Sequence, residues 1–196
     1  MISKRGVEID AVNFFSVPYT SERAKEKVME LASILAQYTS KINLYIVPFT
    51  EIQLQIRDNC PEEHMTLVMR RFMMRIAEKI ARKNKSKALI TGESVGQVAS
   101  QTLAALDVTN AVVDMPVLQP LIGMDKIEIM DRAREIGTFE TSILPYEDCC
   151  TVFTPKHPTV NPKRENIEKS ESVLDVDGLI NAALDGVEMT EIFPKG

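Results

Sequence analysis

One stretch near the middle of the chain most constrains the fold. Residues 88–92, Ala-Leu-Ile-Thr-Gly, form a short aliphatic run that ends at a glycine, and apolar residues at helical spacing follow as far as Leu106. The pattern predicts a buried parallel strand and then a helix that Glu93 and Ser94 open. Ligands of open α/β sheets bind at such carboxyl ends of strands.

The same stretch offers groups that suit a nucleotide. Gly92 would let a backbone amide approach a ligand closely. Gln97 and Gln101, one helical turn apart, would present their amides on one helix face. An ordinary strand–turn–helix corner explains these residues equally well, so both interpretations stay open.

Strands and helices alternate along most of the sequence. Apolar periodicity predicts strands at 7–15, 43–47, 88–91 and 111–114, and helices at 21–38, 50–56, 61–83, from Asp125 to Gly137, and 177–184. Such units joined by short turns indicate an α/β fold: a doubly wound, mainly parallel sheet with helices on both faces. We expect residues 1–165 to form the domain and 166–196 a tail with a short helix packed on it.

Composition limits the class of protein. A chain of 196 residues with 44% hydrophobic content can bury a core, and a net charge of −5 excludes a wholly basic, nucleic-acid-coating surface while leaving room for a local basic stripe. Of three cysteines, two are adjacent, and neither a signal peptide nor a long apolar span is present. We therefore expect a reduced, cytoplasmic protein without membrane contact.

The helix predicted at 61–83 has an apolar face that we expect to be buried: Met65, Val68, Met69, Phe72, Met73, Ile76 and Ile80. It also carries cations, most of which we expect to be solvated: Arg70, Arg71, Arg75, Lys79, Arg82 and Lys83. Arg70 is the exception, because a planar guanidinium beside a strand-end pocket can grip a nucleotide or RNA phosphate in a bidentate manner. Asp125 and Glu128 predict a capping box for the helix that ends at Gly137. Lys126, beside Asp125, is either a surface charge or a partner for an anionic intermediate.

Cys149 and Cys150 follow Pro145-Tyr-Glu-Asp in a loop, which favours sulfur transfer or redox exchange over core packing. Cys60 is expected to pack as a small hydrophobe. His64 and His157 lack the spacing of metal ligands, so we expect no metal site.

The chain begins in a way that suggests the end of a helix. Lys4 and Arg5 supply cations in a last turn, and Gly6 fits the C′ position. We therefore expect this helix to start upstream of Met1.

Five motifs occur in a characteristic order: Phe14-Phe-Ser-Val-Pro-Tyr-Thr, Arg70-Arg-Phe-Met-Met-Arg-Ile, the Gly92–Leu103 stretch, Met124-Asp-Lys, and Pro145-Tyr-Glu-Asp-Cys-Cys-Thr. Together they resemble the ATP-pyrophosphatase (PP-loop) domain of the ThiI family, from Met1 to about Gly186. That family makes 4-thiouridine in tRNA and is also associated with thiamine biosynthesis.

The resemblance implies an adenine nucleotide alpha-hydrolase-like fold and a two-step reaction. ATP, with Mg²⁺ as counter-ion, would adenylate uridine 8 of tRNA, and a persulfide sulfur supplied by a cysteine desulfurase would replace the adenylate. The ATP-contacting positions that match are Asn13, which is more often His in relatives, and Phe14, Arg70, Gly92 and Gln101. Lys126 and either Cys149 or Cys150 match the sulfur-transfer positions.

The chain departs from the family at one point, since it has no Ser-Gly-Gly-x-Asp-Ser phosphate loop. We expect that loop and the first strand to be missing by truncation before residue 1, and this chain alone to be inactive. The sheet would then close up, or a second copy would cover its edge in a homodimer. The alternative is a non-catalytic module that binds a nucleotide or carries persulfide.

Overall fold

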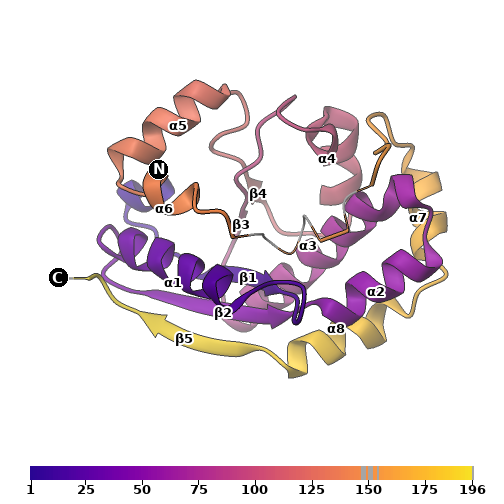
Figure 1. Ribbon diagram of the computed structural model, residues 1–196, viewed down its shortest axis with the longest axis horizontal. Coiled ribbons are helices and arrows are strands. Elements are labelled where there is room, and N and C mark those ends of the chain that lie inside the picture. Colours follow the sequence, from indigo (N-terminus) through magenta and orange to yellow (C-terminus); the bar gives the residue numbers. More distant parts are fainter. Residues whose placement is uncertain (147–148, 150–151, 154, 196) are drawn as a thin grey trace. The chain divides into compact units, whose positions relative to one another are not determined.

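The computed structural model describes residues 1–146, 149, 152–153 and 155–195 (Figure 1). Contacts divide the chain into two compact units. Unit 1 comprises residues 1–49, 124–152 and 186–196, and unit 2 comprises 50–123 and 153–185. Each unit therefore combines segments that are far apart in the sequence.

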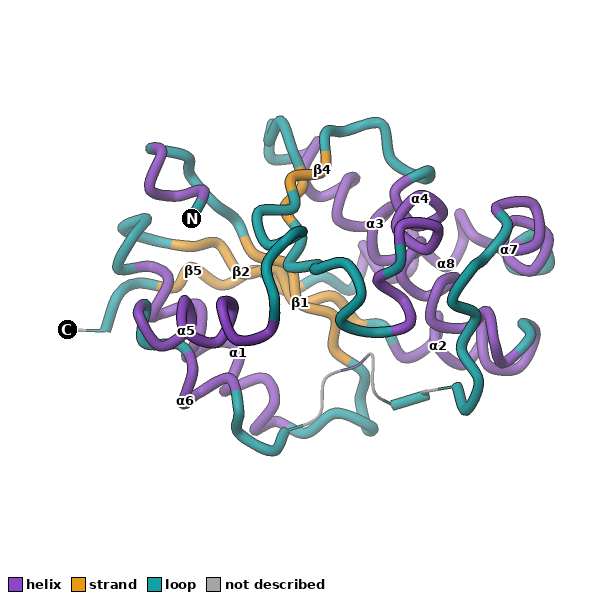
Figure 2. The backbone as a smooth tube through the Cα atoms, turned by 90° about the horizontal axis from the view of Figure 1, so that it is seen from above, coloured by secondary structure: helices purple, strands orange, loops and turns teal. Residues whose placement is uncertain are grey.

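Unit 1 contains a three-stranded sheet in the order β1-β2-β5 (Figure 2). Strand β1 (Ala11–Phe15) runs parallel to β2 (Ile42–Pro48), with Asn13 opposite Ile46. Strand β5 (Glu188–Ile192) adds to β2 in the antiparallel direction. The sequence predicted the first two strands and missed the third.

Helix α1 (Glu22–Ala36) packs on this sheet and matches the predicted helix. The Ser21 side chain caps it by accepting a hydrogen bond from the backbone N–H of Ala24. Ala32 packs in a core cluster with Leu44, Ile46 and Ile192, and partly buried Ala11, Phe15 and Val28 surround it. Burial of these apolar side chains is the main force that holds strand and helix together.

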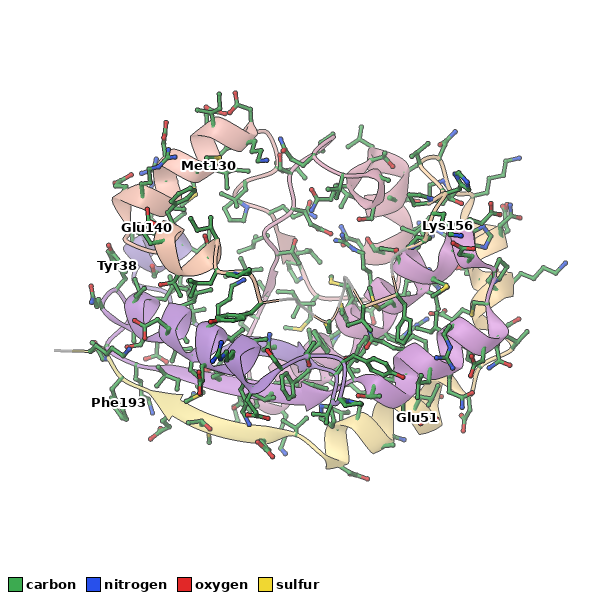
Figure 3. All side chains as sticks on the ribbon, in the orientation of Figure 1. Tyr38, Glu51, Met130, Glu140, Lys156 and Phe193 are labelled. Carbon is green, nitrogen blue, oxygen red and sulfur yellow. The ribbon has the colours of Figure 1, made fainter. Side chains whose placement is uncertain are left out.

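The C-terminal end of the chain is tied to the same helix. The Ser33 hydroxyl donates to the carbonyl of Phe193, 3.1 Å away, and accepts from the N–H of Lys195. Phe193 itself extends beyond β5 with an exposed ring (Figure 3).

Two local predictions in unit 1 are confirmed. Residues Ile2–Arg5 form a short 3-10 helix, η1, which ends at Gly6 in the left-handed conformation with φ of 74°. Asp125 and Glu128 form the capping box of α5 (Lys126–Glu135), and Gly137 ends that segment with a positive φ. The short helix α6 (Phe139–Ser142) follows.

Unit 2 is mostly helical. Its helices are α2 (Thr50–Asn59), η2 (Glu62–His64), α3 (Met65–Lys83), η3 (Ala99–Gln101), α4 (Leu103–Asn110), α7 (Arg164–Glu171) and α8 (Val176–Asp185). Strands β3 (Leu89–Ile90) and β4 (Val117–Leu118) form a parallel pair. The predicted apolar face of α3 is buried, with Val68, Phe72 and Ile76 at 0% exposure.

The prediction that Glu93 and Ser94 open a helix is wrong. Turns follow Ser94, where Gly96 has a φ of 81° and Val98 is extended, so a continuous helix cannot form. Helix α4 starts at Leu103 instead, because the Thr102 side chain accepts from the N–H of Ala105.

The strand predicted at 111–114 is also wrong, since α4 ends at Asn110 and β4 lies at Val117–Leu118. The carboxylate of Glu78 accepts from the backbone N–H groups of Asp114 and Met115, each at 3.1 Å. A side chain on α3 therefore occupies the donors that a strand would use for its ladder.

The α/β class with parallel pairing is confirmed by the pairs β1–β2 and β3–β4, and antiparallel β5 lies at an edge. Among the helices of the described ranges, none is both long and apolar enough to cross a bilayer.

Candidate functional site

Polar residues gather at the carboxyl ends of β3 and β4 in unit 2. Thr91 and Glu93 come directly after β3, and Gln119 comes directly after β4. Glu93 is 5% exposed, and its Oε2 accepts from Thr91 Oγ1 at 2.8 Å and from Gln119 Nε2. The parallel pairing brings the two strand ends together, so this carboxylate lies where α/β folds place ligands.

Arg70 reaches the same place from α3. Its Nη2 forms an ion pair with Oε1 of Glu93, and its Nη1 donates to Ser100 Oγ at 3.4 Å. The expectation that Arg70 lies beside the strand end is confirmed, and its partner is a carboxylate that sequence reasoning assigned only to a helix start. A buried carboxylate needs such a cation to offset its lost hydration.

Gln101 closes the loop that follows Glu93. Its side-chain Oε1 accepts from the N–H of Ser94 at 3.4 Å, and its carbonyl accepts from the N–H of Gly96 at 3.0 Å. Because Gln97 lies in a turn, the two glutamines do not share a helix face, and that prediction is wrong.

Gly92 lies exposed at the end of β3, and a Cβ added there would meet nothing within 4 Å. The structure thus leaves open space beside the backbone that was expected to approach a ligand.

A second group of site residues lines a small hollow in unit 1. Its walls come from β1, from the start of α1 and from the cysteine loop: Asn13, Phe14, Phe15, Thr20, Ala24, Val28 and Cys149. The ring of Phe14 packs edge-on against Phe49 with centroids 4.9 Å apart. Cys149 of the cysteine motif therefore lies beside the adjacent residues Asn13 and Phe14, which match ATP-contacting positions.

Cys149 is 7% exposed, and Cys150 lies outside the described residues. Helix α1 contacts residues shortly before Cys149 in the sequence, since the Lys27 ammonium donates to the carbonyls of Leu144 and Tyr146 at 3.3 and 3.4 Å. Lys126 is the exposed first residue of α5 and is not among the residues that line the hollow.

A buried ion-pair cluster in unit 2 was missed. Arg71 and Arg75 of α3 both bind Glu171 at the end of α7, at 2.9 and 2.5 Å. Arg71 is 3% exposed, so the expectation that it is solvated is wrong. Burial raises the pKa of Glu171, but hydrogen bonds from Arg75 and Arg71 outweigh burial and hold the pKa below its ordinary value.

The neighbouring Cys60 behaves as expected for a structural thiol. Burial, and then the negative charge of Glu171, raise the pKa of Cys60 to about 11, and its Sγ donates to the carbonyl of Ser170. His64 contacts the hydroxyl of that same serine through Nδ1 at 2.8 Å.

The fold and site define the class: an α/β protein with an arginine–carboxylate centre at the carboxyl ends of parallel strands and a thiol in a hollow beside β1. The particular family follows from comparison with known proteins. The family model described as thiamine biosynthesis protein (ThiI) matches residues 1–176. The chain belongs to the ThiI family, as its motifs indicated.

Curated relatives agree with this assignment. A probable tRNA sulfurtransferase of Acetivibrio thermocellus is 67% identical over 192 residues, which are 98% of this chain and 49% of that protein. A probable tRNA sulfurtransferase of Alkaliphilus oremlandii is 58% identical over the same shares. The chain thus spans about half the length of these relatives.

A solved structure shares the fold. The crystal structure of a 4-thiouridine synthetase in complex with RNA and bound ATP matches 96% of this chain and 50% of its own, with 42% identity and a TM-score of 0.92. This agreement confirms the PP-loop type of α/β fold.

Proposed function

We propose that this chain is the ATP-pyrophosphatase part of a tRNA sulfurtransferase, which makes 4-thiouridine from uridine 8. The observation that carries the proposal is the match of 96% of the chain, at 42% identity, to a 4-thiouridine synthetase–RNA complex with bound ATP. The names of the curated relatives point the same way.

ATP binding is assigned to Asn13, Phe14, Arg70, Gly92 and Gln101. The guanidinium at the strand end of unit 2 and the open space at Gly92 suit an anionic ligand. Mg²⁺ would balance the charge on the phosphates when it is bound. Asn13 and Phe14, which line the hollow in unit 1, are assigned to ATP through the family resemblance alone.

The chemistry activates a carbonyl and then replaces its oxygen. The uridine oxygen attacks the α-phosphate of ATP and pyrophosphate leaves. The terminal sulfur of a cysteine persulfide then displaces AMP from the activated carbon, and a second thiol breaks the S–S bond, so that the sulfur stays on the uracil and the two thiols form a disulfide. Cys149 or Cys150 carries that sulfur, delivered by a cysteine desulfurase. Lys126 is assigned to charge balance on the anionic intermediate.

The test compares two proteins: the 196-residue chain, and a chimera in which this chain replaces the matching 49% of the Acetivibrio thermocellus relative. Each is incubated with unmodified tRNA, ATP, Mg²⁺, cysteine and a cysteine desulfurase. Nucleoside mass spectrometry measures 4-thiouridine, and a coupled assay measures pyrophosphate. We expect the chimera to form 4-thiouridine only with ATP and the isolated chain to be inactive; no 4-thiouridine from either protein contradicts the proposal.

A second candidate, a persulfide carrier, is favoured by the position of Cys149 in the hollow beside β1. Protein mass spectrometry of the same samples separates the two. Added sulfur on Cys149 or Cys150 without tRNA-dependent pyrophosphate release supports the carrier, whereas unmodified thiols exclude it. Growth of a thiazole-requiring strain tests the link to thiamine synthesis.

We also propose a homodimer in which a second copy covers the edge of β1 that faces away from β2. Among the described strands, β1 pairs with β2 alone, and an open edge of this kind invites pairing. Sedimentation equilibrium tests this, and a stable monomer at high concentration contradicts it. We expect the protein to act in the cytoplasm, where its thiols stay reduced.

A further inference from the structure

Glu93 is a buried carboxylate for which the chemistry above has no use. It is 5% exposed and contacts three side chains from three segments of unit 2. Arg70 comes from α3, Thr91 from the end of β3 and Gln119 from the end of β4. The burial of this charge needs an explanation, because moving a carboxylate out of water costs free energy unless its partners compensate for the lost hydration.

The contacts show that the Glu93 carboxylate is fixed by the sheet and that it in turn positions Arg70. Oε2 of Glu93 accepts from both Thr91 and Gln119, the residues that directly follow the paired strands β3 and β4. The carboxylate is therefore anchored to the sheet independently of Arg70. Its other oxygen, Oε1, then offers a fixed acceptor to the long side chain of Arg70, which is 20% exposed.

Arg70 has a geometry that suits this arrangement. Its guanidinium meets Glu93 through Nη2 and Ser100 through Nη1. A planar guanidinium held by a carboxylate and a hydroxyl keeps one orientation. Ligand binding then does not have to order this side chain, so the entropic cost of binding is lower.

We propose that Glu93 is a positioning residue, anchored by Thr91 and Gln119, that holds the guanidinium of Arg70 at the carboxyl end of β3 to receive the phosphates of ATP. This inference rests on the proposed ATP binding by Arg70. Glu93 itself acts through the arginine and does not touch the nucleotide.

The test is a double-mutant cycle read by calorimetry with two probes, ATP and adenosine. Glu93→Ala should raise the Kd for ATP at least about tenfold, the loss typical of one charged hydrogen bond, and leave the Kd for adenosine within about twofold. In an Arg70→Ala background the same change should leave the Kd for ATP unaltered, since the positioned group is already gone. Glu93→Gln, which keeps an oxygen acceptor, should restore part of the affinity.

Helix α3, which carries Arg70, also offers a matched control residue. Glu78 lies two turns after Arg70 on α3 and is 12% exposed at its side chain. Its carboxylate pairs with Arg82 at 2.7 Å and accepts from the N–H groups of Asp114 and Met115, so its loss controls for a general disturbance of unit 2. Glu78→Ala should leave both dissociation constants unchanged. Circular dichroism verifies folding, and Glu93→Gln carries the test if Glu93→Ala does not fold.

The outcomes separate the inference from the proposed function. A wild-type chain that binds neither probe overturns ATP binding by this chain and the inference with it. Equal losses for ATP and adenosine, additive losses in the Arg70→Ala background, or tighter ATP binding by Glu93→Ala overturn the inference alone.

Discussion

At the scale of single residues, the described part of unit 2 contains two buried carboxylates with different partners. Glu93 is held by two neutral donors and one arginine at the strand ends. Glu171 is held by Arg71 and Arg75 between α3 and α7. The first lies among residues assigned to ATP, whereas the second joins two helices and has a structural role.

Replacing Glu171 with alanine tests that structural role. The change leaves Arg71 buried without its carboxylate, and breaking a buried pair in this way typically destabilises a protein by about 3–5 kcal/mol. Urea denaturation followed by circular dichroism measures the free energy of unfolding. Glu135→Ala, which removes an exposed pair with Arg132, should change it by no more than about 1 kcal/mol; comparable effects of the two variants would refute the structural role.

The thiol of Cys60 gives a chemical prediction. With its pKa raised from 9.0 to about 11, the thiolate fraction at pH 7.5 is about a hundredfold below that of an ordinary thiol. Iodoacetamide should therefore alkylate Cys60 that much more slowly in the folded protein than in urea, as peptide mass spectrometry can follow. Equal rates in both states would disprove the protection.

At the scale of elements, local rules explain helix ends better than they explain the chain after Gly92. Asp125 and Glu128 satisfy the first N–H groups of α5 within four residues, and the sequence predicted this capping box. After Glu93 the loop is instead closed by Gln101. Helical spacing of apolar residues could not reveal a turn set by Gly96 and Val98.

The cap of α5 predicts a local effect. Asp125→Ala should lower the free energy of unfolding by about 1 kcal/mol, since an N–H of the first turn loses its acceptor. Thermal melting measures the loss, and Asp131→Ala, in the exposed middle of the same helix, provides the control. An unchanged melting temperature for Asp125→Ala would show that water replaces the cap at no cost.

At the scale of the whole molecule, the two compact units do not share the same electrostatic stabilisation. The carboxylate–arginine cluster at Glu171 belongs to unit 2, and its carboxylate titrates below its ordinary value of 4.5. The unfolded chain therefore takes up a proton at Glu171 at higher pH than the folded chain. The stabilisation is complete well above pH 4.5 and is lost as the pH falls through the folded-state pKa.

Acid titration of the whole chain checks the sign. We expect the free energy of unfolding to fall on acidification below about pH 4.5, and the difference between wild type and Glu171→Gln to shrink in that range. Urea midpoints between pH 3 and 7 measure both quantities. A difference that stays constant with pH would contradict a lowered pKa at Glu171.

The sequence by itself determined the features that depend on neighbours within a few residues, or on a repeated pattern. These are the α/β alternation, the buried face of α3, the glycine end of η1, the cap of α5 and the motifs of the ThiI family. Hydrogen bonds across one turn and apolar periodicity depend on residues a few positions apart, so they can be recognised from the sequence before the fold is known.

Only the tertiary structure decided which distant residues meet. Strand β5 carries two glutamates and few strand-forming residues, and it forms because β2 offers an edge and Ile192 packs in the core cluster with Leu44 and Ile46. The exposed pairs of Lys25 with Glu188 and of Lys41 with Glu191 add little to this. The pairs Arg70–Glu93 and Arg71–Glu171 join residues 23 and 100 positions apart. The packing of helices and strands decides which arginine pairs with which glutamate at such separations, because a buried charge pairs with the opposite charge that the fold places next to it.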